Sequence, residues 1–140
     1  MKILFAADGS KHTKKALAFL VTHESLAGAD DEIFVLNVQT PVPLRFKQVL
    51  GGADVAAYHR EEADKVLNPI KRFLSRHKLN FICKSTVGSA APEIINAAKR
   101  ENSHLIVMGT HGYGLLGRTL IGSVAQKVIT DSDIPVLLVK

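Results

Sequence analysis

The chain carries, between residues 105 and 123, the stretch Leu105-Ile-Val-Met-Gly109-Thr-His-Gly112-Tyr-Gly114-Leu-Leu-Gly117-Arg-Thr-Leu-Ile-Gly122-Ser123. It begins as an apolar strand candidate and ends where a helix candidate begins, near Ser123. Five of the ten glycines of the chain belong to it. Without side chains the backbone is open to a ligand, and the N–H groups at a helix N-terminus attract an anion. The stretch therefore predicts a phosphate-binding loop between a strand and a helix.

Strand-like and helix-like segments alternate along the whole chain. Apolar runs of strand length cover Ile3–Ala7, Ile33–Val38, Phe81–Val87, Leu105–Gly109 and Pro135–Val139. Continuous apolar character of this kind is typical of parallel strands that are covered on both faces. Four helices are expected between the strands. The alternation thus predicts an α/β fold with a parallel sheet and right-handed crossovers.

Capping residues and apolar spacing position the helices. The first is expected to begin after Ser10 as its N-cap, and the third opens at Pro92. The second is expected from about Ala56 to His77, where Pro69 should kink or split it. The longest irregular segment is expected at Thr40–Asp54, which contains two prolines and two glycines. It fits either a flap over the carboxyl ends of the strands or a surface loop without a role.

Length and composition indicate a single domain over residues 1–140. The apolar fraction of 46% and the charged fraction of 22% are those of an ordinary globular protein. No apolar run reaches the ~20 residues of a membrane span, and the N-terminus does not resemble a signal peptide. The single cysteine, Cys83, is expected in a buried strand. These features favour a cytoplasmic protein without a membrane partner.

The net charge of +5 raises the question of a nucleic-acid partner. The densest cations are Lys71, Arg72, Arg76 and Lys78, which follow Glu61, Glu62 and Asp64 on one helix candidate. No aromatic residues are interleaved with them to stack on bases. A solvated helix face is therefore the better interpretation, and no nucleic acid is expected. The histidines show no metal-ligand spacing, so no metal site is expected.

Two common glycine motifs do not fit the loop. Gly112-x-Gly114-x2-Gly117 has the spacing of the dinucleotide fingerprint, but the acidic residue required about 20 positions later does not follow a strand. The run Gly112-x4-Gly117-Arg118-Thr119 is close to a P-loop, but Arg118 stands where the compact lysine is needed. Both interpretations are rejected.

A third pattern, Gly109-x2-Gly112-x9-Gly122-Ser123, fits better. It puts glycines at the exit of the strand and a glycine with a hydroxyl at the entrance of the helix. A loop of this kind can fold over a triphosphate. Backbone N–H groups near Gly112, Gly122, Ser123 and Val124 would then face the phosphates.

With this pattern the chain resembles the universal stress protein family over essentially its full length. The resemblance covers Ile3–Ser10, Asn37-Val38, Val87-Gly88, Leu105–Gly112, Gly122-Ser123-Val124 and Pro135–Val139. The Gly-x2-Gly-x9-Gly-[Ser/Thr] signature is specific to the ATP-binding branch of that family. The resemblance implies a three-layer αβα fold with a five-stranded parallel sheet in the order 3-2-1-4-5, the adenine nucleotide alpha hydrolase-like architecture.

The resemblance also implies a site for ATP or another adenylate, together with Mg²⁺. Asp8 matches the position that bonds the ribose, and Val38 the one whose backbone reads the adenine edge. Met108 and Gly109 would line the base and the ribose. The phosphates would be held by Gly112, Gly122, Ser123 and Val124. Asn37 stands where the family often has histidine.

Several residues near the loop allow more than one role. Asp8 can be a turn residue, but Ser10 already caps the helix, so a ligand contact is favoured. His111 has no carboxylate nearby in sequence to orient it, and no catalytic residue is assigned. Arg118 fits a contact with the γ-phosphate and a solvated arginine equally well. Ser123 can donate to a phosphate or accept a phosphoryl group, and the first is preferred.

The resulting hypothesis is an ATP-binding universal stress protein that acts as a nucleotide-dependent dimer in a stress response. Family members commonly dimerise through their last strand, here Pro135–Val139, which otherwise leaves an open sheet edge. ATP hydrolysis or autophosphorylation would be slow at most. The alternative is a dimeric interaction module that works without nucleotide. An enzyme of the hydrolase-like superfamily is disfavoured, because only Asp8-Gly9-Ser10 follows the first strand.

Overall fold

The computed structural model of the protein describes residues 1–111 and 121–140. In these residues, strands and helices alternate. The elements are β1 (Lys2–Ala6), α1 (Lys11–Thr22), β2 (Glu32–Gln39), α2 (Leu44–Arg76), β3 (Asn80–Val87), α3 (Ala90–Arg100), β4 (Leu105–Gly109), α4 (Ser123–Asp131) and β5 (Val136–Val139). None of the helices in the described ranges combines the length and the apolar character needed to cross a bilayer.

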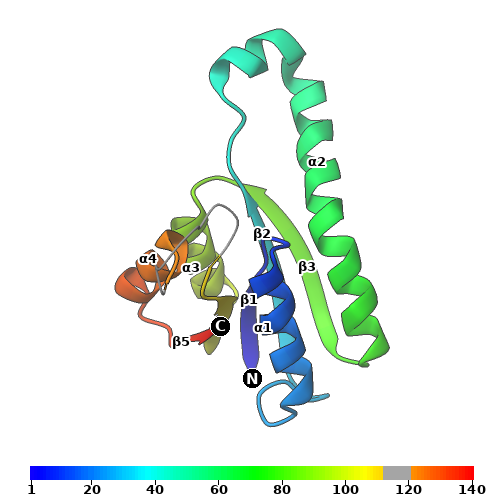
Figure 1. Cartoon of the computed structure of the whole chain (residues 1–140), viewed down its shortest axis with the longest axis vertical. Coiled ribbons are helices and arrows are strands. Elements are labelled where there is room, and N and C mark those ends of the chain that lie inside the picture. Colours follow the sequence, from blue (N-terminus) through cyan, green and yellow to red (C-terminus); the bar gives the residue numbers. More distant parts are fainter. Residues whose placement is uncertain (112–120) are drawn as a thin grey trace.

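The five strands form one parallel sheet in the order β3-β2-β1-β4-β5. The predicted α/β fold and its strand order are therefore confirmed. Helices α1 and α2 cover one face of the sheet, and α3 and α4 cover the other (Figure 1). The strand order reverses between β1 and β4, so their carboxyl ends form the switch point at which ligands bind in such sheets.

Each central strand contributes to two hydrophobic cores. Ile3 and Phe5 of β1 pack toward α1 and α2, while Leu4 and Ala6 pack toward α3 and α4. Phe5 and Leu4 are both completely buried. Because side chains alternate along a strand, a strand that is covered on both faces must be apolar at every position. This burial explains why the sequence shows continuous apolar runs, and it fixes β1 and β4 rigidly beside each other.

Helix α2 differs from the prediction at its beginning. The segment 40–54 is not irregular throughout, because helix begins at Leu44. Gly51 interrupts it with a φ of 79°, a left-handed conformation that glycine adopts at little cost, and helix then continues to Arg76. The short part before Gly51 folds back at the end of the molecule away from the N-terminus (Figure 1).

The prediction of a kink at Pro69 is also wrong. Only Gly51 has non-helical dihedral angles inside α2, and the backbone remains helical through Pro69. Proline removes one backbone hydrogen bond, but it does so here on the exposed side of the helix. The opposite side buries Leu67, Ile70 and Leu74 against the sheet. Burial on both sides of the proline holds the two halves in line.

Candidate functional site

A cavity of about 420 Å³ lies at the carboxyl ends of β1, β2 and β4, where the first turns of α3 and α4 meet the sheet. Seven residues singled out in the sequence line it: Asp8, Val38, Met108, Gly109, Gly122, Ser123 and Val124. Two others, Gly112 and Arg118, lie outside the described residues. The cavity therefore brings together Asp8 and Val124, which are 116 positions apart in the sequence, as the sheet order requires.

Asp8 is fixed by the turn that leads from β1 into α1. Its Oδ1 accepts hydrogen bonds from the N–H of Ser10 at 2.9 Å and from the hydroxyl of Thr13 at 2.6 Å. The N–H of Asp8 in turn donates to the Thr13 hydroxyl at 3.1 Å. The turn role of Asp8 is thus present beside any ligand role. Its Oδ2 accepts no hydrogen bond from the residues the structure describes, and it remains available at the cavity.

The N-terminus of α4 forms another wall of the cavity. Its N-cap is Gly122, which supplies no side-chain cap. The N–H of Gly122 donates to the carbonyl oxygen of Thr110 at 2.6 Å, so this amide is engaged. The amides of Ser123 and Val124 belong to the first turn, where helix geometry provides no partner. These amides and the positive end of the helix dipole suit an anion.

Apolar side chains form the opposite part of the cavity. Leu36 and Val38 come from β2, Met108 from β4, and Ala90 and Ile94 from α3. Met108 and Ile94 are almost completely buried. The cavity therefore has a polar end at α4 and Asp8 and an apolar slot between β2, β4 and α3. A flat apolar group with an anionic tail matches this division.

Gly109 is required by a contact that the sequence does not reveal. A Cβ atom at this position would lie 2.6 Å from Cβ of His12 and 2.9 Å from its carbonyl carbon. Residue 109 must therefore lack a side chain so that the end of β4 can pack against the first turn of α1. Gly109 has this packing role in addition to its place in the cavity wall.

His12 and His111 lie together beside the cavity, with ring centroids 5.0 Å apart. His12 Nδ1 is buried and has no hydrogen-bond partner in the described residues. The pKa of His12 is lowered, mainly by burial and further by His111, Lys11 and Lys15, while Asp8 opposes the shift. Burial therefore favours the neutral form of His12. Thr13, Thr110 and His111 line the cavity, but the sequence did not assign them to it.

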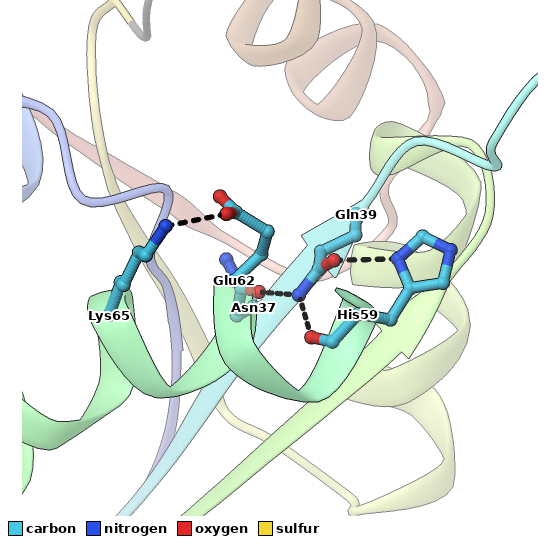
Figure 2. A network of polar contacts seen from close by, with 5 residues as sticks. All are labelled: Asn37, Gln39, His59, Glu62 and Lys65. Carbon is cyan, nitrogen blue, oxygen red and sulfur yellow. Dashed lines mark hydrogen bonds and ion pairs between the residues drawn. The ribbon is translucent and has the colours of Figure 1, made fainter. Parts of the chain in front are cut away.

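Hydrogen bonds tie the end of β2 to α2 (Figure 2) and to Ala7, the residue after β1. Asn37 is buried, and its Nδ2 donates to the carbonyl oxygen of Ala7 at 2.9 Å. Gln39 Nε2 donates to Asn37 Oδ1 at 3.3 Å and to the His59 carbonyl at 2.8 Å. Gln39 Oε1 must then accept from His59 Nδ1, at 2.7 Å. The network holds Val38 in the cavity wall between two anchored residues.

The described residues contain no cluster of three or more histidine, cysteine, aspartate or glutamate side chains that could hold a metal ion.

The fold and the cavity define a doubly wound α/β protein with a ligand cavity at its switch point. Comparison with known proteins then gives the family. The model of the universal stress protein family matches residues 1–140, and the chain belongs to that family. The sequence resemblance is confirmed at the level of the family.

Individual relatives agree with this assignment. A universal stress protein of Thermus aquaticus is 33% identical over 141 residues, which cover 99% of this chain and 97% of the relative. Universal stress protein MJ0577 of Methanocaldococcus jannaschii is 30% identical in sequence, over 99% of this chain and 94% of its own. A solved structure of MJ0577 matches with a TM-score of 0.86 at 29% identity, over 99% and 94% of the two chains.

Solved structures with the same fold contain adenylates. A universal stress protein of Archaeoglobus fulgidus in complex with dAMP matches with a TM-score of 0.72 at 21% identity, over 100% of this chain and 98% of that chain. A family member of Arabidopsis thaliana with AMP bound matches with a TM-score of 0.70 at 16% identity, over 100% and 91%. A universal stress protein in complex with cAMP matches with a TM-score of 0.69 at 19% identity, over 100% and 97%.

Proposed function

We propose that the cavity binds an adenine nucleotide, and specifically ATP with Mg²⁺, and that the protein acts as a nucleotide-dependent regulator in a stress response. The observation that carries the proposal is the convergence of seven sequence-predicted residues on one cavity at the switch point. The cavity volume of about 420 Å³ is within the usual range for small-molecule sites.

The division of the cavity gives each part of the nucleotide a place. The apolar slot beside Val38 and Met108 suits the adenine ring. Asp8 Oδ2 suits a ribose hydroxyl, because the other carboxylate oxygen is already engaged. The amides of Ser123 and Val124 and the Ser123 hydroxyl suit phosphate oxygens. Gly112 and Arg118, on the loop between β4 and α4, are proposed as further phosphate contacts.

The choice of ATP rests on the glycine spacing, whereas adenylates in general are supported by the family. Other members of this fold bind AMP, dAMP and cAMP. The Gly109-x2-Gly112-x9-Gly122-Ser123 spacing leaves a loop long enough to fold over further phosphates. Hydrolysis of ATP would be slow. In the described residues we identify no general base for water, and no group of three or more side chains that could bind a metal ion.

The outer edge of β5 is proposed as the dimer contact. In the sheet order β5 is a terminal strand, and its four residues are half-buried. Pairing with the same strand of a second copy would satisfy backbone groups that otherwise face water. Such a dimer would allow the nucleotide to change the arrangement of two protomers.

Isothermal titration calorimetry with Mg-ATP and with AMP tests the proposal. The Ser123→Asp variant is the most informative one, because aspartate in the first turn favours the helix but repels phosphate. We expect it to weaken ATP binding by about a hundredfold and to leave folding intact. Gln126→Asp, an exposed change of similar size in the same helix, is the control.

Two results would refute the proposal. One is the absence of any binding heat at millimolar Mg-ATP. The other is unchanged affinity in the Ser123→Asp variant. If the dimer and its partner contacts persisted in either case, the nucleotide-independent interaction module would be the better function.

A further inference from the structure

We propose that the outer edge of β3, with the lysines and arginines beside it, binds an extended acidic segment of a partner protein as an added strand. This surface is separate from the nucleotide cavity, and the inference does not depend on nucleotide binding.

The backbone of β3 offers alternating donors and acceptors. β3 is the terminal strand of the sheet opposite β5. The N–H of Gly88, just after the strand, donates to Gln39 of β2 at 2.9 Å. Alternate residues of a parallel strand bond to the same neighbour, so the intervening ones face outward. The N–H and C=O groups of Phe81, Cys83, Ser85 and Val87 therefore point away from β2. They form no hydrogen bond to other described residues.

The strand is also accessible along its length. Ser85 is exposed, and Ile82 and Val87 are 46% and 42% exposed. Helix α2 covers only one face of β3, where Phe81 and Cys83 are half-buried against the core. A peptide of about six to eight residues in extended conformation would match the length of this edge.

The charge along the edge is mostly positive, and the Glu93 carboxylate lies beside Gly88 at the end of the strand. Residues 66–92 contain the five cations Lys71, Arg72, Arg76, Lys78 and Lys84 and no carboxylate. This equals the net charge of the entire chain, which is +5. None of these cations forms an ion pair within the described residues. A strongly cationic surface of this size attracts an acidic partner.

The cations lie on both faces of the sheet edge. Lys71 of α2 is close enough to Cys83 to lower the pKa of its thiol, against the larger effect of burial, which raises it. Lys84 lies on the opposite face, with its Nζ 5.9 Å from the ring of Phe34. The end of α2 and β3 run side by side along one border of the molecule (Figure 1). The side chains of a strand added here would point to both faces of the sheet, and a cation lies near the edge on each face.

These observations favour an acidic peptide over other occupants. Pairing with β3 of a second copy would bring two clusters of five cations together. Single-stranded nucleic acid binds through stacked aromatic side chains, and no exposed phenylalanine, tyrosine or tryptophan lies among these cations, where His77 is exposed. A single edge lysine is enough to prevent aggregation, whereas here α2 and β3 contribute four cations and the turn between them contributes Lys78.

Fluorescence anisotropy with a defined probe tests the inference. The probe is a labelled peptide of about ten residues, made of glutamate and valine and arranged so that both faces of an extended strand carry glutamate. We expect binding at low salt that is weakened about tenfold or more by Lys71→Glu with Lys84→Glu. The control pair, Lys14→Glu with Lys127→Glu, changes the net charge equally on α1 and α4, and it should weaken binding less than about threefold.

Two further measurements separate strand addition from attraction between charges. Methylation of alternate amides of the probe removes N–H donors of the peptide, and the Ser85→Pro variant removes an N–H donor of β3. Each change should reduce affinity about tenfold. Circular dichroism shows whether Ser85→Pro folds, and the methylated probe gives the answer if it does not. Binding that ignores both changes would overturn the inference, as would tighter binding of single-stranded DNA or no binding of the probe at all.

Discussion

Two helix N-termini meet at the switch point, and they are built in opposite ways. α1 follows β1 and is closed by its own side chains: Ser10 Oγ accepts from the N–H of Thr13 at 3.3 Å, and Asp8 Oδ1 holds the same turn. α4 comes after β4 and begins at Gly122, which has no side chain to cap it. Both helices carry donors in their first turn, but only α1 has a side-chain cap, which accepts from one of these donors, the N–H of Thr13.

The difference separates a structural terminus from one that is open to a ligand. The hydrogen bonds from Ser10 and Thr13 fix the position of Asp8, which lines the cavity. The bare start of α4 leaves the amides of Ser123 and Val124 for an anion. The capped N-terminus of α1 and the uncapped N-terminus of α4 thus line the same cavity. The close packing of Gly109 on His12 holds β4 against α1.

The largest effect is expected from filling that packing contact. Gly109→Val should destabilise the fold by about 3 kcal/mol, because its side chain meets the backbone of His12 as well as Cβ. Urea unfolding would measure the loss. Gly52→Ala is the matched control: no atom lies within 4 Å of an added Cβ, and alanine in a helix should stabilise it by about 0.5 kcal/mol. Equal stabilities for the two variants would contradict the close contact.

The same contact shows what the sequence predicts and what it does not. Continuous apolar runs predict the strands because both faces are covered, and Ser10 predicts the start of α1. The glycine spacing and the family resemblance together selected seven residues that line the cavity. The reason for Gly109 depends on His12, which is 97 positions away, and no local pattern reveals such a contact.

Local signals also failed where tertiary burial outweighs them. Pro69 and Gly51 are both helix breakers by intrinsic preference. Burial of Leu67 and Ile70 keeps the helix intact at Pro69, whereas Gly51 lies in a part of α2 that is exposed. The helix therefore breaks at only one of them. The hydrogen bond from Thr13 to Asp8, in contrast, is local. It joins residues five positions apart, and Thr13 is a polar residue in the first turn of α1.

The second prediction concerns the hydrogen bonds at the capped N-terminus of α1. Thr13→Val keeps the shape of the side chain but removes the hydroxyl that bonds both to Asp8 Oδ1 and to the Asp8 N–H. We expect a loss of about 1.5 to 2 kcal/mol, since Thr13 is buried and a backbone donor is left without its partner. Chemical denaturation measures it, and Thr22→Val on the exposed end of α1 is the control. A loss no larger than that of the control would show that Asp8 does not depend on Thr13.

The third prediction compares two serine N-caps. Ser10→Ala should cost about 1 kcal/mol, because the Ser10 side chain accepts from Thr13. Ser89→Ala at the start of α3 should cost only a few tenths of a kcal/mol, because Ser89 makes no side-chain cap hydrogen bond. Thermal unfolding of the two variants tests the difference. Similar losses would mean that the caps are energetically equivalent and that the contrast between closed and open termini does not hold.

The smallest effect concerns pH and the histidine beneath Gly109. Burial lowers the pKa of His12, so the unfolded chain binds this proton more readily than the folded one. Stability should therefore be complete above the unfolded pKa of about 6.5 and should fall as the pH drops below it toward the folded value. Replacing His12 by glutamine removes this contribution, so the difference in stability between pH 7.5 and pH 5.5 should be smaller in the variant. Urea midpoints at the two pH values measure this difference. If it were the same in the wild-type protein and in the variant, protonation of His12 would not destabilise the folded state.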